Sequence, residues 1–193
     1  MSASPSSVNT DGWQCLPPEL AGDEPFLAAV TELHRELYQH RFSHDPAVNP
    51  ALGIEIRAFR RTGEWRIFLL LTPWMLARVL VPDCDPGIEI PSSWRAETRR
   101  KEEFRLLGPT VSLDLLGQQQ SAHLGHHPQL GHYLLQPLAM NMEGYRSADE
   151  VFAAWNRVIR TRDENMAKTQ RDCPWQKEVS RREFFRLGRG KES

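Results

Sequence analysis

The chain has 193 residues, a length typical of a single domain with room for tails. Hydrophobic residues make up 40% of it and charged residues 25%, which excludes a fibrous or wholly disordered protein. The 24 basic and 25 acidic residues nearly cancel, so a globally basic surface is excluded and we expect no nucleic-acid partner.

Cysteine usage and hydropathy indicate the compartment. Cys15, Cys84 and Cys173 are far apart and form no C-x-x-C pair, so the sequence encodes no local zinc knuckle, rubredoxin-type iron site or thioredoxin motif. The N-terminal residues lack the basic and apolar regions of a secretory signal. The longest apolar stretch, residues 67–71, is far shorter than the ~20 residues of a membrane span. We therefore expect a cytoplasmic protein with reduced thiols, no cofactor and no membrane insertion.

The chain begins with residues 1–22, a Ser- and Pro-rich stretch without periodicity, which predicts a flexible tail. Asp23 can cap a helix that has Pro25 in its first turn, and the turn residues after Ser43 require this helix to end before them. Apolar spacing predicts one buried face on the helix. This face comprises Phe26, Val30, Leu33 and Leu37.

The next residues change to the period of β-strands. Residues 54–59 alternate between apolar and polar side chains, residues 61–64 are typical of a turn, and residues 65–71 form a nearly continuous apolar run. These features predict a β-hairpin with a solvated first strand and a more central second strand. Residues 79–81 predict a third, short strand.

A second group of strands is predicted in the middle of the chain. Residues 104–107, 110–116 and 133–136 favour strands. Residues 117–130 are polar and contain glycine and histidine, which predicts a long loop. We interpret the last two strands and this loop as a second hairpin.

The clearest helix start lies near the C-terminal end, where Ser147 and Glu150 have the spacing of a capping box. Helix, antiparallel strands and helix in this order predict an α+β fold, namely a mainly antiparallel sheet with flanking N- and C-terminal helices in a single compact domain. We divide the chain into a flexible tail at residues 1–22, an α+β domain at residues 23–165 and a basic C-terminal tail at residues 166–193. The apolar face of the last helix comprises Val151, Phe152, Trp155, Val158 and Ile159.

Four histidines lie within ten positions of one another, in and just after the predicted loop. One hypothesis is a transition-metal site, because imidazole suits Ni, Zn and Cu. We favour a solvated loop instead, since the stretch contains no carboxylate or thiol and its glycines indicate mobility. The four are His123, His126, His127 and His132.

Two further segments are candidates for binding a partner. Residues 72–76 follow the strongest strand at an expected strand-to-helix corner, where core packing is favoured and an exposed apolar groove is the alternative. From Pro174 onward six basic residues stand against three acidic ones. Residues 180–185 have the lettering of a twin-arginine export motif, without the apolar stretch and N-terminal position that an export signal needs. We expect this tail to dock on its own domain or to stay disordered, with partner binding as the alternative.

No enzyme signature is present, since the sequence contains no G-x-G-x-x-G, Walker, G-x-S-x-G or H-E-x-x-H motif. The chain does carry four other segments in a distinctive order. They read G-E-W-R-I-F-L-L-L-T-P-W-M-L-A-R-V-L-V-P, then L-G-P-T-V-S-L-D-L-L, then Y-L-L-Q-P-L-A-M, and finally S-R-R-E-F-F-R-L-G-R-G. Together they resemble the HybE/HupJ/HoxT family of [NiFe]-hydrogenase assembly chaperones, over residues 24–190.

This resemblance implies a non-catalytic cytoplasmic helper with a compact α+β fold. Such a helper binds precursor subunits of a [NiFe]-hydrogenase, namely the small subunit with its twin-arginine signal, the large subunit or both, and delays export until cofactors are in place. Some relatives are linked to a rubredoxin-like module, from which this chain departs because it has no C-x-x-C pair. The partner-binding positions that the resemblance implies are Thr72, Pro73, Trp74, Met75, Gln136, Pro137, Leu138, Ser180, Arg181, Arg182 and Phe184.

Two other functions stay open at this point. A metal-handling accessory protein would pass nickel through the four histidines, which lie in a segment longer and richer in histidine than we expect of the family. A hydrolase with an unrecognised site is the third hypothesis, although no spacing brings a nucleophile and a base together.

Overall fold

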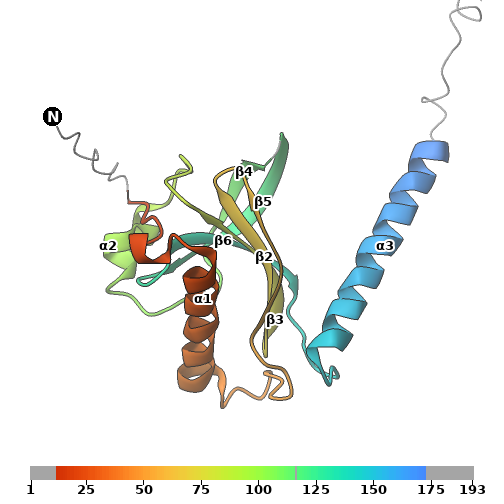
Figure 1. The fold of residues 1–193 in the computed structure, drawn as a ribbon, viewed down its shortest axis with the longest axis horizontal. Helices are drawn as coiled ribbons and strands as arrows, with labels where there is room; N and C mark the ends of the chain where they lie inside the picture. Colours follow the sequence, from red (N-terminus) through yellow and green to blue (C-terminus); the bar gives the residue numbers. More distant parts are fainter. Residues whose placement is uncertain (1–11, 116, 173–193) are drawn as a thin grey trace, which may run out of the picture. The chain divides into compact units, whose positions relative to one another are not determined.

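The computed structural model describes residues 12–115 and 117–172, with side chains as far as Met166. The chain divides into two compact units, Met1–Ala148 and Asp149–Ser193. The first unit contains a six-stranded sheet with the strand order β1-β2-β3-β6-β5-β4, in which every neighbouring pair is antiparallel (Figure 1). A helix precedes the sheet in sequence and another follows it, so the predicted α+β fold is confirmed.

The elements have the following bounds. The helices are α1 (Asp23–Leu37), α2 (Ala96–Arg99) and α3 (Ala148–Asp172), with three short helical turns, η1 (Pro18–Leu20), η2 (Tyr38–Phe42) and η3 (Ser92–Trp94). The strands are β1 (Glu55–Thr62), β2 (Trp65–Thr72), β3 (Met75–Pro82), β4 (Thr110–Leu115), β5 (Gln118–His127) and β6 (Gly131–Ala139).

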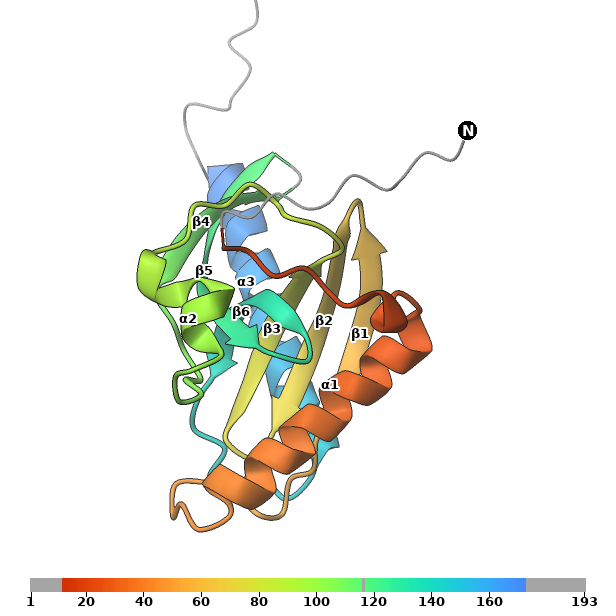
Figure 2. The ribbon, with the colours of Figure 1, turned by 90° about the vertical axis from the view of Figure 1, so that its left-hand side faces the viewer.

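Helix α1 lies across one face of the sheet (Figure 2). Gly22 occupies the cap position rather than Asp23, whose carboxylate instead pairs with Arg61, 2.7 Å from its Nη2. The helix continues into the π-helical turn η2 and ends before Ser43, as predicted. The predicted apolar face is confirmed, since Phe26, Val30, Leu33 and Leu37 are all buried.

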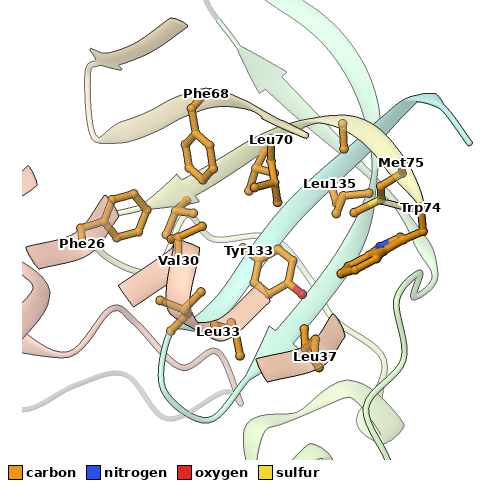
Figure 3. Close-up of a cluster of buried hydrophobic side chains, with 14 residues drawn as sticks. Phe26, Val30, Leu33, Leu37, Phe68, Leu70, Trp74, Met75, Tyr133 and Leu135 are labelled. Carbon is orange, nitrogen blue, oxygen red and sulfur yellow. The ribbon is translucent and has the colours of Figure 1, made fainter. Parts of the chain in front are cut away.

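A first cluster of buried side chains packs between α1 and the sheet (Figure 3). The ring of Phe26 meets the ring of Phe68 edge-on, with 5.7 Å between the centroids. Tyr133 of β6 packs over Gly125 of β5, where a Cβ would lie 2.2 Å from the tyrosine Cε2. Glycine is therefore required opposite Tyr133, because the aromatic ring occupies the space of a side chain.

A second cluster uses the alternate residues of the same strands. Ile67, Leu80 and Leu134 belong to it together with Trp13 and Trp94. Because successive side chains of a strand point to opposite faces, the sheet contributes to a hydrophobic core on each side.

Residues 12–22 differ from the flexible tail that their composition predicts, because they pack against the first unit. Trp13 is buried, with 5% of its surface exposed. The guanidinium of Arg66, which is 2% exposed, donates to the backbone oxygens of Leu20 at 2.8 Å and Ala21 at 2.6 Å and to Asp83 Oδ1 at 2.8 Å. These anchors lie far away in sequence, so local composition does not reveal them.

The predicted loop at residues 117–130 is wrong, because residues 118–127 form the strand β5 between β4 and β6. Ala122 and Leu124 are buried at alternate positions, and the polar residues around them conceal this two-residue period. The predicted strand at residues 104–107 is also wrong, since these residues lie outside any strand and pack apolar side chains against the first cluster. The third strand is longer than predicted, because it begins at Met75.

Helix α3 begins directly after Ser147, as the capping-box sequence predicts, and continues to Asp172. The sequence division at residue 165 therefore falls inside a helix. Residues 163–172 contain neither proline nor glycine and are rich in helix-forming residues, which explains the continuation.

Candidate partner-binding site

Residues 72–75 form the turn between β2 and β3. Thr72 is paired with Met75 across the turn, and Thr72 Oγ1 accepts a hydrogen bond from the Met75 N–H at 3.1 Å. The same hydroxyl donates to the Met75 oxygen, also at 3.1 Å. The predicted strand-to-helix corner is therefore wrong, because the chain reverses at Pro73 and Trp74 into a third strand.

All four residues of this turn are buried, so the favoured interpretation as core is correct and the exposed groove is wrong. Trp74, which is 5% exposed, points into the first cluster (Figure 3). Its indole stacks on Phe42 at 4.4 Å between centroids and on Tyr38 and His34 at 6.5 Å each. Partner binding by these residues stays a prediction, and it requires the residues that cover them to act as well.

One of the covering residues, Phe42, borders a surface cavity of about 720 Å³. Phe42 both stacks on Trp74 and lines this cavity, which places the tryptophan one side chain away from the surface. Arg41 and Glu103 form an ion pair at its rim, with 2.7 Å between Nη1 and Oε1. Removing the aromatic ring of Trp74 would therefore change this surface, because Phe42 would lose the ring on which it stacks.

The second predicted segment lies beside the first. Pro137 is opposite Ala77 in the β3–β6 ladder, two residues from Met75. Gln136 is half-buried, and its Oε1 accepts a hydrogen bond from Arg78 Nε at 2.5 Å while its Nε2 donates to the Ser121 oxygen at 2.8 Å. The structure thus brings the two predicted sets together at one end of the central strands.

The third predicted set, Ser180, Arg181, Arg182 and Phe184, lies outside the described residues. Its role in partner binding stays a prediction.

The four histidines belong to β5 and β6 rather than to a solvated loop. His126 and His132 are cross-strand neighbours with 4.6 Å between ring centroids, and both are buried. His123 Nδ1 bonds to the Gly108 oxygen at 2.9 Å, and His127 Nδ1 accepts from the Gln129 N–H at 3.3 Å. Both sequence interpretations thus missed that these side chains are part of the packed sheet.

Burial favours the neutral form of three of these imidazoles, those of His126, His127 and His132. Desolvation, with a smaller contribution from the neighbouring His132, lowers the pKa of His126 to about 3. Desolvation likewise lowers the pKa of His127 to about 4, and it lowers the pKa of His132 as well. Within the part of the chain that the structure describes, no three His, Cys, Asp or Glu side chains are grouped so that they could hold a metal ion.

Helix α3 carries an exposed apolar stripe, of which the sequence predicted Val158 and Ile159 as part of an apolar face but not Met166. Three large apolar side chains of this helix face solvent: Val158 at 57%, Ile159 at 38% and Met166 at 49% exposure. Ile159 and Met166 are two helical turns apart and therefore lie on the same side, with Val158 next to them. The seven-residue spacing from Ile159 to Met166 is the signal that would have added Met166 to the predicted face.

None of the described helices combines the length and the apolar character needed to cross a membrane. A family model described as "[NiFe]-hydrogenase assembly, chaperone, HybE" matches residues 26–187. No curated protein and no solved structure matches the chain.

Proposed function

Because the chain belongs to the HybE family of [NiFe]-hydrogenase assembly chaperones, we propose that it binds precursor subunits of a [NiFe]-hydrogenase in the cytoplasm until assembly is complete and export begins. The proposed partners are the small subunit with its twin-arginine signal, the large subunit or both. We further propose that the chain acts by binding alone and catalyses no reaction.

The exposed stripe of α3 is the observation that supports this proposal most directly. Val158, Ile159 and Met166 present adjoining apolar surface on a helix that also exposes Arg157 and Arg160. Exposed apolar patches rimmed by charge are typical of surfaces that bind another protein. An unfinished subunit exposes apolar surface of its own, which such a stripe would cover.

The experiment is co-purification of this chain with tagged small and large subunit precursors. We expect the wild type to be retained by at least one of them, and Ile159→Asp to weaken retention by about tenfold or more, because a buried carboxylate replaces an apolar contact. Ala153→Asp is the matched control, since this exposed residue lies on the side of the helix away from Val158, Ile159 and Met166 and receives the same charge. The proposal is rejected if neither subunit retains the wild-type chain.

The predicted residues divide into two proposed roles. Thr72 to Met75 would hold the β2–β3 turn and the Phe42 surface in place, whereas Arg181 and Arg182 would contact the partner as donors to its acidic groups. Arg181→Ala combined with Arg182→Ala should therefore weaken subunit retention without changing the midpoint of urea unfolding. A fall in that midpoint would instead assign these arginines to folding.

The metal-handling alternative predicts nickel binding by His123, His126, His127 and His132. The ring atoms described above already bond to the protein, which does not favour this function. Calorimetric titration of nickel into the chain without an affinity tag tests it. His123 and His127 are the two half-buried positions. Nickel binding that persists in the double variant His123→Gln with His127→Gln would come from other groups.

A further inference from the structure

Strand β4 forms one edge of the sheet, and β1 forms the other. An edge strand exposes backbone N–H and C=O groups that can pair with another extended chain. The two edges of this sheet differ in how they are protected.

The β1 edge is protected by charge and by irregular geometry. Three arginines, Arg57, Arg60 and Arg61, lie along it. Its pairing with β2 shifts register between Arg57 and Arg60, and Ala58 has a φ of 54°, so the edge is bent at a bulge. Both devices oppose the addition of a further strand.

The β4 edge has no bulge and no basic side chain. The strand pairs with β5 in a continuous register from Thr110 to Leu115, and it contains no proline, lysine or arginine. Just before it, the Leu124 N–H donates to the Pro109 oxygen at 2.9 Å. Because antiparallel ladders alternate, the backbone groups of Thr110, Ser112 and Asp114 then point away from β5. Among the described residues, the outward N–H and C=O groups of these three residues form no hydrogen bond with another backbone group.

A groove of about 640 Å³ runs along this edge. All five residues from 110 to 114 line the groove. Successive side chains of a strand point to opposite faces of the sheet, so a groove on one face would contact only every second residue. The edge of the strand itself therefore forms one wall of the groove. Residues 86–89 also line the groove, and within the described residues no backbone hydrogen bond joins them to β4.

The groove is acidic. Glu64, Glu89 and Asp114 line it, and no lysine, arginine or histidine among the described residues does. Glu89 is exposed, and Asp114 also accepts a hydrogen bond from the Gly117 N–H at 2.8 Å. A segment that carries carboxylates would be repelled here, whereas a cationic segment would be attracted.

We propose that the groove along the free edge of β4 receives an extended peptide segment bearing arginine or lysine, which joins the sheet as a seventh strand. The backbone of the segment would supply affinity through Thr110, Ser112 and Asp114, and its basic side chains would supply selectivity through the three carboxylates. That the segment belongs to an unfinished hydrogenase subunit rests on the proposed function.

The test is titration of the full chain with three synthetic hexapeptides, followed by amide chemical shifts and hydrogen exchange. The probe is acetyl-Thr-Arg-Val-Arg-Val-Thr-amide. One control peptide replaces both arginines with glutamate, and the other carries N-methyl groups at alternate residues, which keeps the charge but removes strand pairing. We expect slower exchange at Thr110, Ser112 and Asp114 with the probe alone, and about tenfold weaker binding to Glu89→Lys. Glu36→Lys, an exposed charge reversal on α1, is the matched control and should bind as the wild type does.

Three other outcomes overturn the proposal. Equal binding of the N-methylated peptide would mean charge attraction without strand addition. Unchanged binding by Glu89→Lys would place the peptide elsewhere. If Arg181→Glu with Arg182→Glu made the full chain bind the probe more than tenfold more tightly, the groove would belong to the chain's own C-terminal segment. Peptide binding without retention of either hydrogenase subunit would leave the groove intact and reject the proposed function instead.

Discussion

Gln14 and His132, 118 positions apart, are joined by two hydrogen bonds. The backbone N–H of Gln14 donates to the ring atom Nδ1 of His132 at 2.7 Å, and the backbone N–H of His132 donates to the backbone oxygen of Gln14 at 2.8 Å. Because a backbone N–H can only donate, Nδ1 must be the acceptor, and the ring proton lies on Nε2, which donates to the Trp94 oxygen at 2.8 Å. The neutral imidazole is thus the form that ties the N-terminal segment to the sheet.

Acid should therefore destabilise the fold. The pKa of His126 in the folded chain is about 3 and that of His132 is also lowered, so the unfolded chain binds more protons as the pH falls below about 6.5. The free energy of unfolding should fall from pH 6.5 toward pH 3–4, and urea titrations across this range measure it. His126→Gln should show a shallower fall, whereas His44→Gln, at an exposed position, should follow the wild type. An unchanged slope in His126→Gln would contradict this assignment.

The contact of Gly125 with Tyr133 makes a second prediction. Gly125→Ala should lower the free energy of unfolding by about 1–3 kcal/mol, because the new Cβ overlaps the buried tyrosine ring and forces the strands apart. Gly53→Ala is the matched control, since a Cβ at that position meets no atom within 4 Å. Urea unfolding of both variants decides the matter, and equal midpoints would show that β5 and β6 can separate without cost.

The elements that the sequence predicted correctly have local signals. Helix α1 has a strong period that its burial follows, and the β1–β2 hairpin has a turn sequence followed by a continuous apolar run, which is mostly buried in β2. Strand β5 lacks such a signal, because its buried residues Ala122 and Leu124 stand in a polar segment and are followed directly by Gly125. Pairing with the neighbouring strands β4 and β6, which flank it in the sheet, explains why so polar a segment is extended.

The burial of the candidate site was predicted from its residue types, but the residues that cover it were not. T-P-W-M does mark a turn at the end of a strand, and Gln136 does lie nearby in the sheet. The burial of Trp74 depends on Phe42 and Tyr38, which the π-helical turn places on its ring. A helix end that changes its pitch leaves no periodic trace in the sequence, so this cover could not be foreseen.

The buried Arg66 provides a third prediction. Its guanidinium bonds to Asp83 and to two backbone oxygens and lies 4.7 Å from the Phe26 ring centroid. Arg66→Ala should lower the free energy of unfolding by about 3–5 kcal/mol, since buried polar groups lose their partner. Arg66→Lys should recover only part of this, because an ammonium group cannot reproduce the guanidinium fork. Limited proteolysis should cut residues 12–22 faster in both variants, and wild-type resistance in Arg66→Ala would contradict the anchoring role.

The Trp74 stack gives the fourth prediction, which separates folding from binding. Trp74→Ala removes a fully packed ring and should cost about 3–5 kcal/mol of unfolding free energy, measured with urea. Trp74→Phe retains an aromatic ring against Phe42 and should cost clearly less. Since Trp74 is buried, subunit retention by Trp74→Phe should equal that of the wild type, whereas Ile159→Asp should lose retention without losing stability. If Trp74→Phe keeps its stability yet loses retention, the indole itself contacts the partner, and the β2–β3 turn must open to expose it.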